Sequence, residues 1–204
     1  RYLASFNNAL DNRGLPGSYI VQGPGWAQAS SAPFRFFKLF TSEGGIRAPL
    51  IIKMPGTMKH AGQWNKSLVH VTDIMPTLLE LTGTQYPSEF SGHKIHPIIG
   101  QSVAQILHGD VEEIQTDRGI GYEMFEMKAY IQGKWKILRL PVPMGTGDWE
   151  LFNLEKDPGE TTDLSTQHPD IKNRMIEAWQ EYARQNDIYD HQGHYDSLYR
   201  RSFN

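Results

Sequence analysis

Cysteine is absent from the 204 residues of this chain. Its absence excludes disulfide bonds, metal sites built from thiolates, and a cysteine nucleophile. It does not identify a compartment, because periplasmic and cytoplasmic proteins can both lack cysteine. The localisation therefore stays open between the periplasm and the cytoplasm.

Long apolar runs and basic clusters are also missing. The longest apolar stretch, residues 48–54, is interrupted by Pro49 and Lys53, so we expect no membrane span. With 20 basic residues, 23 acidic residues and a net charge of −3, the chain does not indicate a nucleic-acid or anionic-membrane partner. Neither an initiator Met nor the apolar region of a signal peptide begins the chain. We interpret it as a fragment, arising from cloning, proteolysis or a truncated gene.

Hydrophobic residues make up 39% of the chain, enough for a packed core. The elements expected before residue 36 are a helical segment at residues 2–10, a strand at 18–22, a turn at 23–25 and a loop at 27–35. The apolar run at residues 46–52 follows a sharp Gly44–Gly45 turn and predicts a buried strand.

Two helices are predicted in the next segment. One covers residues 73–81, with Thr72 as its N-cap and Gly83 just beyond its end. The other covers residues 102–108 and is stopped by Gly109.

The composition changes after residue 110, where short alternating segments predict four strands, at residues 119–123, 126–131, 134–140 and 149–154. A long amphipathic helix begins at Pro169, and its apolar face carries Ile171, Met175, Ile176, Trp179 and Tyr182. We therefore expect a small antiparallel sheet covered by one helix, followed by a polar, aromatic tail.

Three stretches stand out by their order and spacing. The first is WAQASSAPFRFFK at residues 26–38, followed by EGGIRAP at 43–49. The second is VHVTDIMPTLLELTG at residues 69–83, and the third is WELFNLEKDPGE at residues 149–160. Together they resemble the sulfatase family over residues 5–186, and the GPGWAQAS segment is similar to the bacterial arylsulfatase branch in particular.

The resemblance implies an α/β fold. Residues 1–110 would be the C-terminal portion, including the edge, of the large alkaline-phosphatase-like α/β sulfatase domain. Residues 111–186 would be a small C-terminal α+β subdomain, an antiparallel sheet with one packed helix, and residues 187–204 a C-terminal tail.

The same resemblance implies a hydrolase of sulfuric esters that produces an alcohol or phenol and sulfate. Family members use a formylglycine nucleophile, made in a C/S-x-P-x-R motif, and a calcium ion held by Asp and Asn side chains. Both lie upstream of this chain, which would bind no cofactor by itself and would be inactive alone. The implied partners are a small sulfate ester or sulfated carbohydrate and the missing N-terminal half.

Lys38 is the one catalytic residue that the resemblance implies, because it stands five residues before Glu43 of the EGG turn. An ammonium group can stabilise negative charge on a sulfate or on its leaving oxygen. Trp26 and Gln28 are candidates for lining the substrate pocket, and His70 for contacting substrate. The alternatives are an exposed lysine for Lys38, loop packing for Trp26 and Gln28, and simple packing for His70.

Three other patterns invite misinterpretation. SAPFR at residues 31–35 matches S-x-P-x-R, but the helix with Leu-Thr-Gly that follows the family motif is missing. Asp11 and Asn12 are followed by Arg13 rather than Gly, and no strand precedes them, so we do not expect a calcium site there. The histidines and aspartates at residues 190–196 are weak candidates for a metal site.

Two other functions remain open from the sequence. One is a phosphonate or phosphate monoester hydrolase of the same superfamily. The other is a non-catalytic domain that binds sulfated ligands, in which Lys38 would be a remnant. The natural substrate and the oligomeric state cannot be derived from these residues.

Overall fold

The structure is a computed structural model that describes residues 5–19, 23–56, 59–114 and 118–189. The chain divides into two compact units, one formed by Arg1–Ala48 with Gly121–Asn204 and the other by Pro49–Ile120. We call the first the sheet unit and the second the helical unit. Residues 1–48 thus group with the C-terminal sheet, which differs from the division at residue 110 that the sequence suggested.

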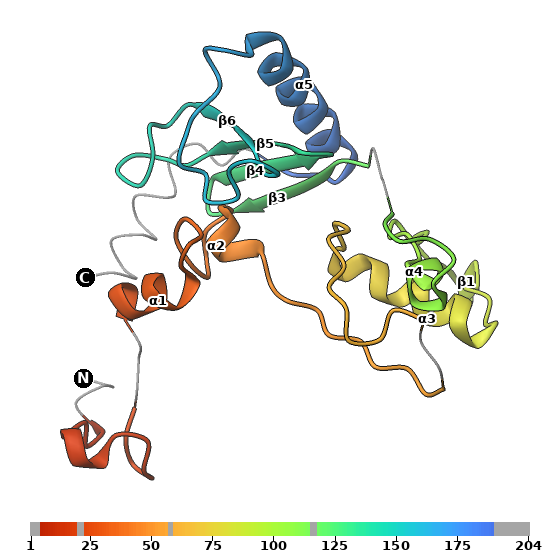
Figure 1. Ribbon diagram of the computed structural model, residues 1–204, viewed down its shortest axis with the longest axis horizontal. Coiled ribbons are helices and arrows are strands. Elements are labelled where there is room, and N and C mark those ends of the chain that lie inside the picture. The colour runs from red at the N-terminus through yellow and green to blue at the C-terminus, as the bar shows by residue number, and fades with distance from the viewer. Residues whose placement is uncertain (1–4, 20–22, 57–58, 115–117, 190–204) are drawn as a thin grey trace. The chain divides into compact units, whose positions relative to one another are not determined.

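The sheet unit is built on four antiparallel strands in the order β3-β4-β5-β6 (Figure 1). Their bounds are Ile120–Met124, Met127–Gln132, Trp135–Arg139 and Trp149–Asn153. Tyr130 pairs with Ile137, and Ile137 pairs with Leu151, so these side chains share one face. All four strands were predicted from the alternating pattern, and the prediction is confirmed.

Helix α5, Pro169–Gln185, packs on that face, as Figure 1 shows. Its Met175, Trp179 and Ala183 are buried against the strands. Pro169 fits the first turn because the missing N–H is not needed there. The predicted helix and its apolar face are therefore confirmed.

The opposite face of the sheet is covered by the segment before residue 48. Phe40 is buried in an apolar cluster with residues from β4, β5 and β6, including Ala129, Leu138 and Phe152. The sheet is thus enclosed between α5 and this N-terminal segment, which contains α1, Gly23–Ser31, and α2, Glu43–Ile46. A short 3-10 helix, η2, covers Leu10–Asn12.

The helical unit contains η3, Val71–Asp73; α3, Ile74–Thr82; a hairpin of β1, Glu89–Phe90, and β2, His93–Lys94; and α4, Ala104–His108. Gly83 and Gly109 end α3 and α4 in the left-handed conformation, as predicted. The N-cap differs, because His70 caps η3 with its side chain one turn before the predicted start.

The expected turn at residues 23–25 is wrong, and so is the expected loop at 27–35 as far as residue 31, because α1 covers Gly23–Ser31; residues 32–35 form a loop as expected. Pro24 stands in the first turn, where no N–H is required, so Gly-Pro-Gly opens a helix here. The helix predicted at residues 2–10 is absent from residues 7–9, and residues 1–4 lie outside the described part. The strand predicted at 18–22 is absent at residues 18–19, and residues 20–22 lie outside that part.

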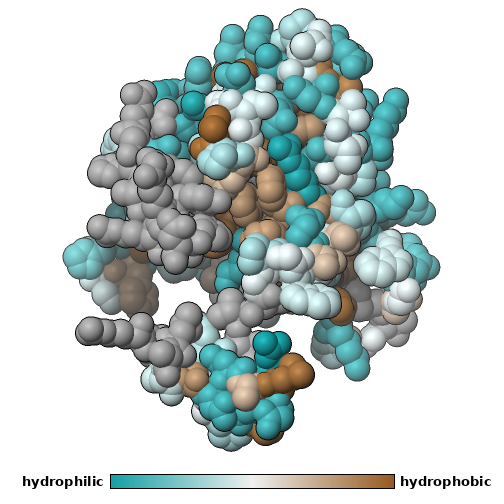
Figure 2. All heavy atoms as spheres, turned by 90° about the vertical axis from the view of Figure 1, so that its left-hand side faces the viewer, coloured by the Kyte–Doolittle hydropathy of each residue, from teal (hydrophilic) through white to brown (hydrophobic). Residues whose placement is uncertain are grey.

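The buried strand predicted at residues 46–52 is also wrong. Ile46 ends α2, and residues 47–52 form no ladder with another described strand. Ile51 is 91% exposed and Leu50 is 51% exposed. An apolar run needs a partner strand to become a buried strand, and the described residues offer none. Figure 2 shows one face of the molecule, on which hydrophobic side chains, in brown, lie among hydrophilic ones, in teal.

Candidate functional site

Lys38 lies in residues 33–42, which we call the lysine loop. The side chain of Lys38 is exposed, and it forms no hydrogen bond or ion pair with another described residue. Two positive-φ residues, Phe36 at 58° and Leu39 at 88°, shape the backbone around it. The Phe40 N–H donates to Phe37 O at 3.1 Å and closes the turn that presents the lysine.

Aromatic side chains anchor this loop on the sheet. Phe36 stacks on Phe40 with ring centroids 4.4 Å apart, and Phe37 meets Phe40 edge-on at 5.2 Å. All three pack on the apolar cluster of the sheet. The loop therefore holds Lys38 between aromatic groups whose positions are set by the core.

Gly44 and Gly45 lie directly beneath the loop. A Cβ atom at Gly44 would come within 2.0 Å of Phe36 O, and one at Gly45 within 2.0 Å of Phe40 O. The Gly44 N–H also donates to Arg35 O at 3.0 Å. Only glycine leaves room for this close approach, so the EGG sequence and the lysine loop form one packed unit.

Behind the loop lies a buried group of charges, Glu43, Lys136 and Glu160, which we call the ion cluster. Lys136 Nζ lies 2.9 Å from Glu43 Oε1 and 2.7 Å from Glu160 Oε1. The side chains of Lys136 and Glu160 are 0% exposed. Glu160 Oε2 accepts the backbone N–H of Glu43 at 2.9 Å.

Burial raises the pKa of Glu160, an effect that the charge of Lys136 opposes without cancelling. Arg47 Nη1 approaches Glu43 Oε2 at 3.5 Å from the half-exposed side of the cluster. With Arg47 included, two carboxylates face two cations, so the group is close to neutral. Such pairing is what makes burial of charges tolerable.

Gln28 and Trp26 both lie on α1. Gln28 Nε2 donates to Phe34 O at 3.0 Å, so Gln28 supports the start of the lysine loop. Trp26 is 73% exposed. In the sheet unit the structure therefore places Gln28 against the loop that carries Lys38.

His70 belongs to the helical unit, whose placement relative to Lys38 is not determined. Its Nδ1 lies 2.9 Å from Thr72 Oγ1 and accepts the Thr72 N–H at 3.4 Å, so the ring caps η3. Burial lowers the pKa of His70, and the charge of Arg118 lowers it further while Asp73 acts in the opposite direction. A neutral ring is what the capping role needs, since Nδ1 must accept.

Asp73, directly after this cap, is the centre of a second buried ion pair. Arg118 donates to both carboxylate oxygens of Asp73, at 2.6 and 2.7 Å. The N–H groups of His70 and Gln101 donate to the same carboxylate, each at 2.8 Å. Asp73 is 1% exposed and therefore ties together three segments of the helical unit.

Comparison with known proteins identifies the family. A family model described as N-sulphoglucosamine sulphohydrolase, C-terminal, matches residues 34–187. An uncharacterised sulfatase of Schizosaccharomyces pombe is 37% identical over 185 residues, which cover 90% of this chain and 33% of the relative. The arylsulfatase of Klebsiella aerogenes is 35% identical over 102 residues, which cover 50% of this chain and 22% of that enzyme.

The chain belongs to the sulfatase family.

It spans about a third or less of the length of these two curated relatives. The structure of Ps i-CgsB in complex with k-i-k-neocarrahexaose superposes with a TM-score of 0.62 at 24% identity, over 83% of this chain and 36% of that one. The fold is that of the C-terminal portion of an alkaline-phosphatase-like sulfatase, as the resemblance implied.

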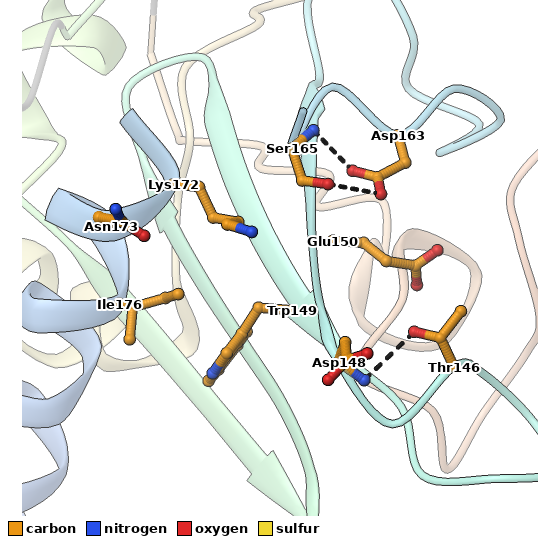
Figure 3. Close-up of a pocket in the computed structure, with 9 residues that line it drawn as sticks. All are labelled: Thr146, Asp148, Trp149, Glu150, Asp163, Ser165, Lys172, Asn173 and Ile176. Atoms are coloured by element: carbon orange, nitrogen blue, oxygen red, sulfur yellow. Dashed lines mark hydrogen bonds between the residues drawn. The ribbon is translucent and has the colours of Figure 1, made fainter. Parts of the chain in front are cut away.

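A cavity in the sheet unit does not suit the sulfate group of a sulfatase substrate. It has a volume of about 440 Å³ and lies between β6 and α5 (Figure 3). Asp148, Glu150 and Asp163 line it together with a single cation, Lys172. An excess of carboxylates repels an anionic ligand, so we do not assign the substrate to this cavity.

Calcium is the metal ion that the family resemblance implies, with its ligands upstream of this chain. In the four described ranges no group of three or more His, Asp or Glu side chains is close enough to hold a metal ion. We therefore derive no step through calcium from these residues. Within the same ranges no helix is long and apolar enough to cross a membrane. The histidines at residues 191 and 194 lie outside the described residues.

Sequence reasoning missed Lys136, Glu160 and the Asp73–Arg118 pair. The sequence did contain a signal for Lys136. Residues 136, 138 and 140 are two positions apart and therefore share one face of the strand, and Leu138 and Leu140 mark that face as the core side. Glu160 ends the WELFNLEKDPGE stretch, whose pattern does not mark it as buried.

Proposed function

We propose that this chain is the C-terminal part of a sulfatase that hydrolyses sulfate monoesters to an alcohol or phenol and sulfate, and that Lys38 contacts the sulfate group. The observation that carries the proposal is the position of Lys38 on a loop that aromatic residues and the EGG turn hold in place. Preorganised positive charge of this kind stabilises an anion at little reorganisation cost. Both curated relatives named above are sulfatases, which favours a sulfate over a phosphate ester.

The remaining groups would come from the part of the protein that the longer relatives have. Formylglycine and calcium are expected there, so the 204-residue chain alone should not turn over a sulfate ester. We also propose that Trp26, Gln28 and His70 lie on the substrate side in the longer protein. The assignment of residues 1–110 to its large domain remains a prediction about that protein.

The role of Lys38 is tested in an enzyme that joins this chain to an upstream sulfatase segment. Lys38→Ala should lower kcat by about 10²–10³, the usual loss for one charge-stabilising contact, with a smaller change in KM. The loss should grow with the pKa of the leaving phenol, because poor leaving groups develop more charge. Lys134→Ala, an exposed lysine of the same unit, is the matched control and should leave kcat unchanged.

A loss below about tenfold that does not depend on the leaving group would contradict the role of Lys38. Hydrolysis of an aryl phosphate in preference to an aryl sulfate would favour the phosphate hydrolase. Metal-independent binding of a sulfated ligand by the chain, with no turnover in the joined enzyme, would favour the non-catalytic domain.

Inactivity of the chain alone has a separate test. The purified chain is incubated with an aryl sulfate, with and without calcium, and compared with the joined enzyme. We expect no turnover above buffer. Turnover that Ser31→Ala abolishes would instead make the SAPFR segment a functional formylglycine motif.

A further inference from the structure

The ion cluster buries charge where apolar side chains would pack well. Lys136 lies in β5 on the same face as Leu138, which belongs to the apolar cluster under Phe40. Replacing buried ionic groups with apolar groups of similar volume is often neutral or stabilising. Stability alone therefore gives no reason for three charges at this position.

What the cluster adds is a fixed connection between three segments. Lys136 comes from the middle of the sheet, Glu160 from the turn after β6, and Glu43 from the first residue of α2. Glu160 holds the backbone of Glu43 directly, because its Oε2 accepts the Glu43 N–H, and it shares Lys136 with the Glu43 side chain. Ion pairs and hydrogen bonds have directions, so they set the position of α2 more closely than apolar contact can.

The lysine loop ends where this connection begins. Phe40 lies three residues before Glu43, and the carbonyl oxygens of Phe36 and Phe40 rest on Gly44 and Gly45. At its other end the loop is held by Arg35, whose Nη1 lies 3.2 Å from Glu150 Oε2 on β6. Any shift of α2 must therefore move the backbone that presents Lys38.

We propose that Glu43, Lys136 and Glu160 are positioning residues that fix the lysine loop, so that Lys38 meets a sulfate group in one orientation. The proposal rests on the proposed function of Lys38. It adds a role for the DPGE turn at residues 157–160, because its Glu160 is linked to Glu43 at the end of the lysine loop.

Glu160→Gln is the sharpest variant. Glutamine keeps one oxygen that can accept the Glu43 N–H, but its amide NH2 then faces Lys136 and the ion pair with residue 160 is lost. Lys136 stays paired with Glu43, so no buried charge is left without a partner. Burial already favours the uncharged form of residue 160, since it raises the pKa of Glu160. The variant should therefore fold, while Glu160→Ala removes the acceptor entirely. Glu181→Gln, an exposed glutamate of α5 paired with Arg184, is the matched control.

The kinetic test uses the joined enzyme and a double-mutant cycle. A misplaced catalytic group can cost about 10²-fold in rate, so Glu160→Gln should lower kcat at least tenfold, Glu160→Ala more, and Glu181→Gln not at all. In the Lys38→Ala background, Glu160→Gln should change kcat less than about twofold, because the group it positions is gone. Equal losses in both backgrounds would overturn the positioning role. A small effect of Lys38→Ala itself would instead contradict the proposed function.

Amide hydrogen exchange on the 204-residue chain tests the mechanical part without activity. In Glu160→Ala, the Phe40 and Gly44 N–H groups, which bond to Phe37 O and Arg35 O, should exchange at least tenfold faster than in the unmodified chain. The Leu154 N–H, bonded to Lys134 O in the same unit, should keep its rate. Unchanged exchange at Phe40 and Gly44, or an equal increase at all three amides, would overturn the proposal.

Discussion

At the scale of single residues, Gly45 has no room for a side chain. A Cβ atom there would meet Phe40 O at 2.0 Å and Phe37 O at 2.6 Å, both backbone atoms of the lysine loop. Backbone cannot swing aside as a flexible side chain can, so Gly45→Ala must displace the loop. We expect a loss of about 1–3 kcal/mol in the free energy of unfolding, measured by urea titration.

Gly25→Ala is the matched control for that substitution. Gly25 lies in α1, and a Cβ atom there would meet nothing within 4 Å. Because alanine is the better helix former, Gly25→Ala should be neutral or stabilise by up to about 1 kcal/mol. If the two variants had equal stability, the close packing of the EGG turn against the loop would be contradicted.

Residue roles were predictable from sequence only where a local pattern carries them. The position of Lys38 before the EGG turn is visible in the sequence. The exposure of its side chain is not, because its apolar neighbours Phe36, Phe37, Leu39 and Phe40 favour partial burial. The partners of Lys136 do not, since Glu43 lies 93 positions away along the chain. Strand alternation tells which face Lys136 occupies, but only the folded chain shows which carboxylates arrive there.

Asp73 makes the stability of the helical unit depend on pH. Burial alone would raise the pKa of Asp73, but the hydrogen bonds from Arg118, His70 and Gln101 outweigh it, and the pKa lies below its ordinary value of 3.8. A depressed carboxyl pKa contributes stability that is present above pH 3.8 and is lost as the pH falls through the folded value. Stability of this unit should therefore fall below pH 3.8.

Asp73→Asn isolates that contribution. The variant leaves Arg118 without its anion, so at pH 7 we expect a loss of about 3 kcal/mol, the lower end for a broken buried pair. The part of the acid-dependent loss that comes from Asp73 should disappear. Asp110→Asn, an exposed aspartate of the same unit, should change stability by less than about 0.5 kcal/mol. Urea titrations at pH 7 and pH 3 check both variants, and an unchanged acid dependence in Asp73→Asn would contradict the assignment.

At the scale of elements, α5 carries the core on its face of the sheet. Trp179 is 6% exposed, its ring lies 5.9 Å from that of Trp149, and Lys128 Nζ lies 5.3 Å from it. Trp179→Ala should cost about 3–5 kcal/mol, because the lost contacts leave a cavity that neighbours fill only in part. The neighbouring exposed Gln180→Ala should stay within about 0.5 kcal/mol. Urea midpoints measure both, and a loss below about 1 kcal/mol for Trp179→Ala would contradict the packing of α5.

Elements whose partners are close in sequence were predicted correctly. Strands β3 to β6 follow one another along the chain and pair with their neighbours, so alternation and turn residues were sufficient. The strand predicted at residues 46–52 failed for the opposite reason, because a buried strand is completed by a neighbour that its own sequence does not contain. Helix α1 failed because Gly-Pro-Gly is compatible with both a turn and the first turn of a helix.

At the scale of the whole molecule, the helical unit has several large apolar side chains exposed to solvent. On η3 and α3, Val71, Met75 and Leu78 are 71%, 54% and 53% exposed, and Ile51 of the extended segment is 91% exposed. Large exposed apolar patches mark interaction sites, and Val71, Met75 and Leu78 recur at the spacing of one helical face. The relatives are longer than this chain, which covers 33% of the Schizosaccharomyces pombe sulfatase. We therefore expect an upstream sulfatase segment to cover the extended segment at residues 49–54.

Ile51→Asp separates the two situations. In the 204-residue chain the side chain is in solvent, so the substitution should change the free energy of unfolding by less than about 0.5 kcal/mol. In the enzyme joined to an upstream segment the same carboxylate would be buried without a partner, and the cost should be at least about 2 kcal/mol. Because the substitution is identical, the chain alone serves as the control for intrinsic strand or loop preferences. Urea titration of both proteins gives the difference, and equal effects in the two would mean that the extended segment stays exposed in the longer protein.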